Sequence, residues 1–235
     1  MSRDRAIRRA RPLLAWAVCL AAPWAAVAGS VELPYQIGGA YSMRVRSLQE
    51  AKFAATIRQQ YDFSCGSAAL ATLLTHHYQF PVSEDAVFDA MFAGGDQAKI
   101  RVEGFSLLDM KRYLEANGFE ADGYEEPLSK LAEAGIPAIV LINEAGYSHF
   151  IVVKGLRDGR VLIGDPAGGT RAMSVAAFEA IWTSRVLFVI GNRQDRARFN
   201  TAADWRAVPR APIASAVGQD GLGGVTLPKL GPGDF

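Results

Sequence analysis

Cys65 is the residue of this chain best suited to nucleophilic chemistry. It opens a run of alanine and leucine at helical spacing that continues to Tyr78, so we expect it at the N-terminus of a helix. A thiol attacks as the thiolate, and the positive end of a helix favours that form. Gly66 would leave room for a substrate backbone. The alternative for Cys65 is a small apolar core residue.

A base for the thiol must come from one of the 3 histidines. His76 and His77 follow on the same helix, about 16 to 18 Å from Cys65 at the usual helical rise. Neither reaches the thiol, and neighbouring helical residues do not face one metal ion. We expect both at a solvated helix end. His149 opens a β-branched strand and is the candidate general base.

Asp165 ends the strand that follows His149. The Asp158-Gly159 pair between the two strands indicates a tight hairpin, which would make His149 and Asp165 cross-strand neighbours. Asp165 alone is typical of an Asx-turn, but its placement favours a role in orienting His149. A side-chain amide upstream of Cys65 could bind an oxyanion, and either Gln59 or Gln60 fits.

The elements that must position these residues are helices first and strands later. Ser83 and Ser106 are typical helix caps, and residues 127–134 indicate a further short helix. Apolar, β-branched runs predict strands at 138–142, 149–153, 161–163 and 185–190, with a helix over 175–182 before the last. The order predicts an α+β fold in which N-terminal helices pack on an antiparallel sheet.

The two ends of the chain differ from this central region. Residues 1–28 carry arginines, then an apolar run, then Ala26-Val27-Ala28, which indicates a signal peptide and a periplasmic location. A retained membrane anchor or a lipid on Cys19 are the alternatives. Cleavage would leave Cys65 as the one cysteine in an oxidising compartment. Residues 29–192 are the predicted domain, and residues 193–235, rich in Pro and Gly, predict a disordered tail.

Composition limits the classes of partner. The 235 residues are 50% hydrophobic and 21% charged, which suffices for a full core. With 25 basic and 24 acidic residues the net charge is +1, so no long-range field would attract nucleic acid. We expect no cofactor and no metal, and a peptide or protein as the substrate.

Three segments resemble the peptidase C39 family of bacteriocin-processing, double-glycine cysteine peptidases: Gln59-Gln-Tyr-Asp-Phe-Ser-Cys65-Gly, Ser148-His149-Phe-Ile-Val-Val and Ile163-Gly-Asp165-Pro-Ala-Gly168. The resemblance covers residues 50–192. It implies a papain-like fold and cleavage after Gly-Gly. It also implies that Cys65 is the nucleophile, His149 the base, Asp165 its orienting partner and Gln59 the oxyanion donor, with Gln60 as the fallback.

The chain departs from the family pattern in three ways. Ser64 stands where an acidic residue commonly precedes the cysteine, no transporter or ATPase domain follows, and a signal peptide replaces cytosolic placement. Exported relatives of this kind accompany secretion systems for extracellular fibres, including functional amyloid, so the resemblance implies periplasmic processing of a fibre component or its export machinery. The alternatives are a non-catalytic peptide-binding chaperone and a cell-wall amidase or transglutaminase-like enzyme.

Overall fold

The computed structural model describes residues 30–32, 42–44 and 47–208. The predicted signal peptide and residues 209–235 therefore lie outside the described residues. The chain divides into two units, Met1–Arg46 and Ser47–Phe235. In the first unit, β1 (Ser30–Glu32) pairs antiparallel with β2 (Ser42–Arg44).

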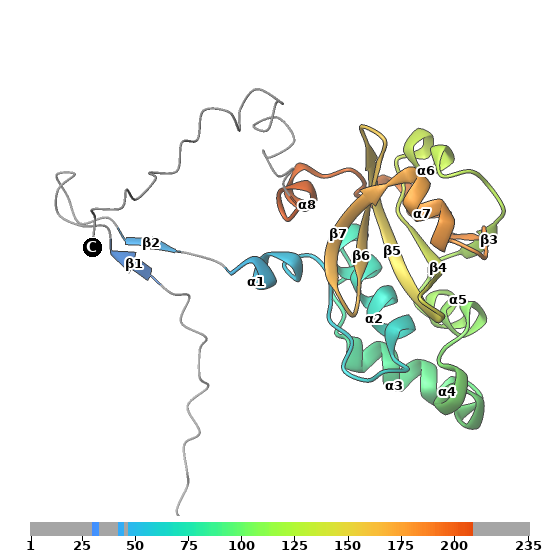
Figure 1. The fold of residues 1–235 in the computed structure, drawn as a ribbon. Helices are drawn as coiled ribbons and strands as arrows, with labels where there is room; N and C mark the ends of the chain where they lie inside the picture. The colour runs from blue at the N-terminus through green and yellow to red at the C-terminus, as the bar shows by residue number, and fades with distance from the viewer. Residues whose placement is uncertain (1–29, 33–41, 45–46, 209–235) are drawn as a thin grey trace, which may run out of the picture. The chain divides into compact units, whose positions relative to one another are not determined.

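The second unit is built on a six-stranded sheet in the order β3-β8-β4-β5-β6-β7 (Figure 1). Every pairing in it is antiparallel. The strands are β3 (Ala121–Tyr124), β4 (Ala138–Glu144), β5 (Tyr147–Arg157), β6 (Arg160–Asp165), β7 (Gly169–Ser174) and β8 (Leu187–Ile190). The central strands are the β-branched runs that the sequence predicts as strands.

The helices begin where the sequence places their caps. The Ser83 hydroxyl accepts from the Ala86 amide, and Ser106 forms a capping box with Asp109. The helices are α1 (Leu48–Lys52), α2 (Cys65–Thr72) with its π-helical continuation η2 (Leu73–His77), α3 (Glu84–Gly94), α4 (Gln97–Glu103), α5 (Leu107–Ala116), α6 (Ser129–Ala134), α7 (Val175–Ile181), the 3-10 helix η3 (Gln194–Arg196) and α8 (Ala202–Arg206).

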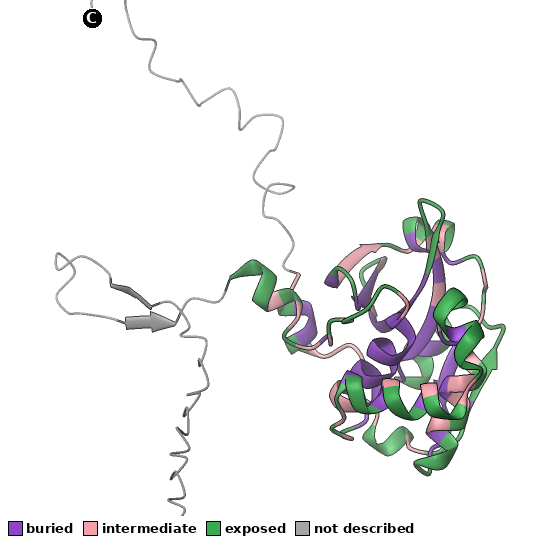
Figure 2. Ribbon diagram, turned by 90° about the horizontal axis from the view of Figure 1, so that it is seen from below, coloured by how far each residue is buried: buried purple, intermediate pink, exposed green. Residues whose placement is uncertain are grey.

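Apolar side chains fill the space on both faces of the sheet. On one face α2, α3 and α5 pack against strand residues that include Phe150 and Val152. On the other, α6 and α7 cover a set that includes Ile151 and Val153. The inner strands β4, β5, β6 and β8 and the helix α2 are accordingly the most buried part of the unit (Figure 2). The predicted α+β class, with N-terminal helices on an antiparallel sheet, is confirmed.

Within residues 47–192, two strands and one helix were not expected from the sequence: β3, β7 and α4. Both strands lie at the edges of the sheet, where one side of the strand faces no partner and fewer residues need be apolar. β3 reads Ala-Asp-Gly-Tyr with one buried residue. Because an edge strand can be largely polar, a run of apolar residues does not predict it.

The folded chain continues past Asn192, the end of the predicted domain. η3 and α8 follow, and Asp204 and Trp205 are buried, so the expected disorder does not hold for residues 193–208. His77 is also buried, and its Nδ1 lies 2.7 Å from the Arg198 carbonyl. The prediction of a solvated helix end was wrong for His77, because the segment after residue 193 packs over it.

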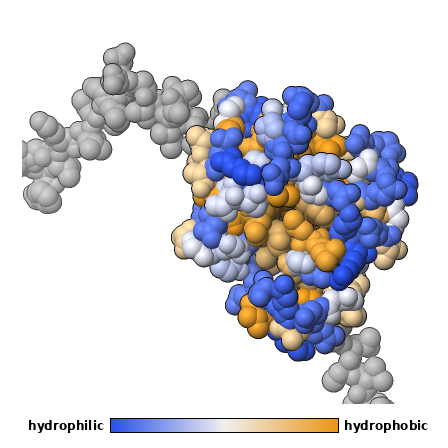
Figure 3. Space-filling model, turned by 90° about the vertical axis from the view of Figure 1, so that its right-hand side faces the viewer, coloured by the Kyte–Doolittle hydropathy of each residue, from blue (hydrophilic) through white to orange (hydrophobic). Residues whose placement is uncertain are grey.

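The outer surface mixes apolar and hydrophilic areas. On the face in Figure 3, apolar side chains gather near the centre and hydrophilic ones surround them. None of the helices in the described part of the chain is long and apolar enough to cross a membrane. Across residues 30–32, 42–44 and 47–208, no three His, Cys, Asp or Glu side chains are grouped to hold a metal ion.

Candidate active site

Cys65 is the first residue of α2, as the sequence predicts. Its thiol is free and only 9% of the residue is exposed. α2 packs against β5, and the backbone amide of Phe150 on that strand hydrogen-bonds to the sulfur, as do the amides of Gly66 and Cys65 itself. The sulfur therefore lies at the junction of the helix start with the strand that carries His149.

Burial and hydrogen bonding act in opposite directions on this thiol. Burial raises the pKa of Cys65 above its ordinary value of 9.0, while the three amides oppose the rise. Because burial is the larger effect, the helix N-terminus alone does not make Cys65 a thiolate at neutral pH. The thiol therefore needs a base.

Gly66 has a packing role rather than the one expected. A Cβ on this residue would lie 2.9 Å from Met110 Cε and 3.0 Å from Phe105 Cβ. The space above Gly66 is thus filled by side chains of the protein, and the interpretation that it admits a substrate backbone was wrong. Gly66 lets the start of α2 approach Phe105 and α5 closely.

His149 and Asp165 meet across the β5–β6 pair. His149 Nε2 and Asp165 Oδ2 are 3.4 Å apart, and both side chains are buried. The other ring nitrogen, Nδ1, is buried and has no hydrogen-bond partner in the described part of the chain. If Nε2–H donates to the carboxylate, Nδ1 carries the lone pair of a base.

Asp165 makes the contacts of an Asx-turn and also contacts His149, the two interpretations that the sequence left open. Its Oδ1 accepts from the amides of Ala167 and Gly168, at 2.9 and 3.2 Å, which is an Asx-turn. Its Oδ2 faces His149. Burial alone would raise the pKa of Asp165, but the hydrogen bond from His149 and the two amides lower it to about 2. The carboxylate is therefore charged at any physiological pH.

The hairpin does not set His149 directly opposite Asp165. The pairing runs from Arg157↔Arg160 to Val152↔Gly164, with one register shift between Val153 and Gly155. One further pair would place Asp165 beside Ile151. His149 is then a diagonal neighbour of Asp165, two residues along β5 and on the same face, which is within reach of its ring.

Arg171 on β7 completes the surroundings of Asp165, although no sequence pattern selected it. Its Nη2 lies 3.2 Å from Asp165 Oδ2 and 2.6 Å from Glu144 Oε2. A Glu144–Arg171 pair thus fixes the carboxylate from the side away from the turn. Because β7 was not predicted as a strand, nothing indicated that residue 171 pairs beside residue 163.

Gln59 lies close to the site and Gln60 does not. The backbone N–H of Gln59 donates to Pro166 O, next to Asp165. Its Nε2 donates to Tyr61 O at 3.0 Å, and its side chain also hydrogen-bonds to Tyr147. Gln60 is exposed and its Nε2 donates to Asp85 on α3 at 2.8 Å. The fallback residue therefore faces away from Cys65.

A cavity of about 550 Å³ lies beside the thiol and the imidazole. Cys65 and His149 line it together, and Tyr147, whose hydroxyl donates to Asp62 O at 3.0 Å, forms part of its wall. Further lining residues are Phe63, Arg101, Val102, Glu103, Gly104, Phe105, Leu141, Ser148 and Phe150. The cavity is large enough for several residues of an extended peptide.

A buried thiol at a helix start and a carboxylate-bound histidine on the adjoining strand are the groups that thiol-dependent hydrolases use. A model of the family "Peptidase C39 family" matches residues 54–194. The chain therefore belongs to the peptidase C39 family, and it is a cysteine peptidase with the papain-like fold that the resemblance implied.

Curated relatives agree with this assignment. The chain is 43% identical over 159 residues to a "Probable functional amyloid protease FapD" of Pseudomonas aeruginosa, a match that covers 68% of this chain and 70% of the relative. A protein of the same name from Pseudomonas fluorescens is 40% identical over 189 residues, covering 80% of this chain and 82% of the relative.

A solved structure is also similar in part. It is described as a double glycine motif protease from an AMS/PCAT transporter in complex with the leader peptide. The identity is 27%, the TM-score is 0.48, and the match covers 57% of this chain and 89% of that one.

Proposed function

We propose that this protein is an exported cysteine endopeptidase that cleaves its substrate after a double glycine, with Cys65 as nucleophile, His149 as base, Asp165 as its orienting partner and Gln59 as an oxyanion donor. The observation that carries the proposal is the buried His149, which binds Asp165 through Nε2 and lines the same cavity as Cys65. Its Nδ1 has no partner among the residues that the structure describes.

The proposed reaction begins when a peptide carbonyl enters the cavity. His149 Nδ1 takes the thiol proton as the sulfur of Cys65 attacks the carbonyl carbon, and Asp165 stabilises the imidazolium that forms. The imidazolium then protonates the leaving amine, and a water molecule, deprotonated by the same nitrogen, hydrolyses the thioester. As the thioester bond breaks and the carboxylic acid leaves, the imidazolium returns that proton to the sulfur of Cys65, so His149 is neutral again after each half of the reaction.

Gln59 would assist this reaction by donating to the oxyanion. Its Nε2 already donates to Tyr61 O, and its side chain hydrogen-bonds to Tyr147, so Tyr147 would have to release the side chain when substrate binds. The backbone amide of Cys65 can supply a second donor from the helix start. This assignment makes Tyr147 the residue that governs access to the amide.

The family resemblance and the relatives' names support a proposal for the substrate class. We propose a periplasmic protein or peptide that is processed during export, with a component of an extracellular amyloid fibre as the candidate. This proposal includes removal of residues 1–28 as a signal peptide, so N-terminal sequencing of the mature protein should begin at Gly29.

A peptide panel tests the proposed activity. Synthetic peptides with one internal Gly-Gly are incubated with the purified protein and with Cys65→Ser, and products are identified by mass spectrometry. We expect cleavage after the second glycine by the wild type alone, and none when either glycine is replaced by valine. Cleavage by both proteins would contradict the proposal. Secretion that is fully supported by Cys65→Ser would favour the chaperone alternative.

A further inference from the structure

Lys154 is a fully buried charge that the proposed reaction does not use. It is 0% exposed, and its ammonium group contacts three acceptors: Asp204 Oδ1 at 2.7 Å, Ala55 O at 2.7 Å and Thr170 Oγ1 at 3.4 Å. Burying such a group costs free energy even when it is paired.

Lys154 is the extra residue of a β-bulge in β5. Val153 pairs with Ile163 and Gly155 with Leu162, so β5 has one residue more than β6 at this point. The alternation of faces is interrupted accordingly: Val153 and Leu156 both contact the core under α6 and α7. A bulge shifts the register of everything beyond it by one residue.

This shift decides whether His149 can reach Asp165. From Val152↔Gly164 onward, Asp165 shares a face with Ile151 and therefore with His149. If the register set at Arg157↔Arg160 continued without the bulge, Asp165 would instead pair with Val152 and share the face of Phe150. His149 would then point to the opposite face of the sheet.

The segment 198–206, which we name the C-terminal clamp, holds the bulge in place. The backbone N–H of Asn200 donates to the Lys154 carbonyl at 2.9 Å, and the side-chain Nδ2 of Asn200 donates to the Leu156 carbonyl at 2.8 Å. A bulge leaves such backbone groups without a ladder partner. Asp204, on α8 of the same clamp, binds the Lys154 side chain.

The clamp packs so closely on β5 that a side chain between them is excluded. A Cβ on Gly155 would lie 2.4 Å from Asn200 Oδ1. Trp205 Nε1 donates to the same Asn200 oxygen at 3.2 Å, which fixes the amide that serves Leu156. The clamp lies beyond residue 194, where the match to the family model ends.

We propose that Lys154 and Asp204 are positioning residues for the peptidase: the clamp fixes the bulge of β5 and thereby keeps His149 on the face where Asp165 orients it. The inference rests on the proposed roles of His149 and Asp165. It predicts that damage to the clamp lowers catalysis in molecules that are still folded.

The test compares Asp204→Asn and Asn200→Gly with a control, Phe178→Leu, in the core under α7. Glycine tolerates the φ of +59° at residue 200 and removes only the side-chain hydrogen bonds, so Asn200→Gly carries the test if Asp204→Asn fails to fold. Activity is divided by the folded fraction from circular dichroism. The ¹⁵N spectrum of the imidazoles reports the His149 tautomer, assigned with His149→Ala.

We expect kcat of both clamp variants to fall by between about tenfold and a hundredfold with KM nearly unchanged, together with loss of the Nε2–H tautomer of His149. Phe178→Leu should keep its activity per folded molecule. Wild-type kcat and tautomer in both folded clamp variants would overturn the inference. Failure of the proposed function would show differently, as equal activity of the wild type and His149→Ala.

Discussion

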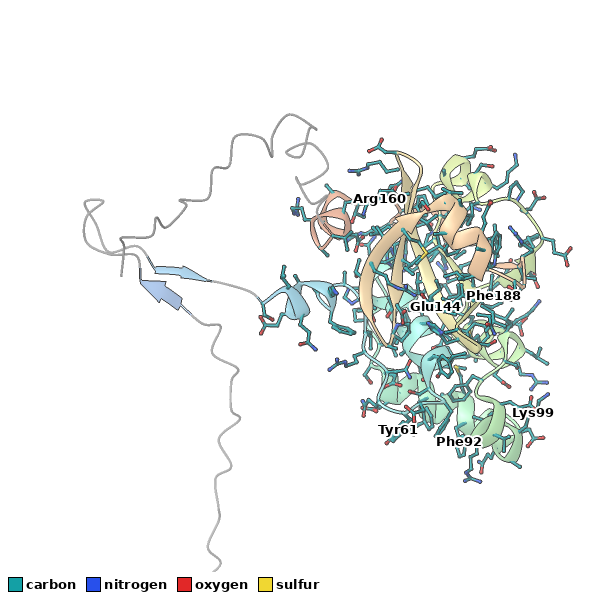
Figure 4. All side chains as sticks on the ribbon, viewed as in Figure 1. Tyr61, Phe92, Lys99, Glu144, Arg160 and Phe188 are labelled. Atoms are coloured by element: carbon teal, nitrogen blue, oxygen red, sulfur yellow. The ribbon has the colours of Figure 1, made fainter. Side chains whose placement is uncertain are left out.

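β5 carries two buried charged sites, and they differ in what they leave unsatisfied. At one, Lys154 gives its three ammonium hydrogens to Asp204, Ala55 and Thr170. At the other, His149 binds Asp165 through one nitrogen and leaves Nδ1 without a partner in the described residues. Figure 4 labels a residue near each: Glu144, which binds the Arg171 beside Asp165, and Arg160, which lies over Trp205 of the clamp.

This difference separates a structural charge pair from a reactive one. Both aspartates have a lowered pKa, against the effect of burial. Hydrogen bonds from His149 and two backbone amides stabilise the Asp165 carboxylate, and the charge of Lys154 stabilises that of Asp204. A lowered pKa therefore does not distinguish them. The free nitrogen Nδ1 of His149 does distinguish them among the described residues, because it can take up a proton without breaking an existing hydrogen bond. The ammonium group of Lys154 instead has all three hydrogens bound to acceptors.

The sharpest contrast is expected from removing the basic partner at the reactive site. His149→Ala should lower kcat/KM on the order of 10⁴-fold or more and change the free energy of unfolding by only about 1 kcal/mol. Stability is spared because Asp165 keeps Arg171 and two amides. Peptide cleavage and urea unfolding measure the two quantities, and a large loss of stability would make His149 structural.

The Lys154 site should behave in the opposite way. Asp204→Ala leaves a buried ammonium group without its counter-ion, so the free energy of unfolding should fall by about 3 to 5 kcal/mol. Adding Lys154→Met removes the remaining charge and should restore much of that loss. Urea unfolding of the two single variants and the double variant checks this. Additive losses in the double variant would contradict the pairing.

Acid should weaken both sites, because each aspartate binds protons less readily in the folded state. The ordinary pKa of Asp165 is 3.8 and the folded value is about 2, so its contribution is complete above pH 3.8 and is lost as the pH falls toward 2. The shift corresponds to about 2 kcal/mol. Urea midpoints at pH 5 and pH 3 should differ less in Asp165→Asn than in the wild type; an unchanged pH dependence would refute this origin.

The smallest expected effect distinguishes the two glutamines. Gln59→Ala should lower kcat by about tenfold. This loss is smaller than that expected for removing a dedicated oxyanion donor, because the side-chain amide of Gln59 also binds Tyr61 and Tyr147. Gln60→Ala, whose amide binds Asp85, serves as the matched control and should leave kcat unchanged. Steady-state kinetics on one peptide decides between them, and equal effects would remove Gln59 from the proposed mechanism.

The sequence predicted the elements that carry the candidate site because they follow local rules. An alanine-rich run starting at Cys65 specifies a helix, and β-branched residues from His149 specify a strand. The Asp-Gly pair gives the hairpin. These signals suffice to bring a thiol, an imidazole and a carboxylate to neighbouring elements.

Features that depend on contacts distant in sequence could not be predicted in this way. The bulge at Lys154 is visible only once the register of β5 and β6 is known, and its support by Asn200 and Asp204 joins residues far apart in the chain. Arg171 was hidden because β7 is a polar edge strand. The clamp was missed because its few apolar residues form no periodic pattern, although Trp205 is buried.

The dependence of Cys65 on His149 is the central claim, and the pH profile of thiol alkylation tests it most directly. Iodoacetamide labelling of Cys65 is followed by mass spectrometry from pH 6 to pH 10 in the wild type and in His149→Ala. Burial raises the pKa of the thiol above 9.0. We predict substantial wild-type labelling at neutral pH, and a His149→Ala rate that is low there and rises about tenfold per pH unit up to that pKa. Identical profiles in the two proteins would contradict the account.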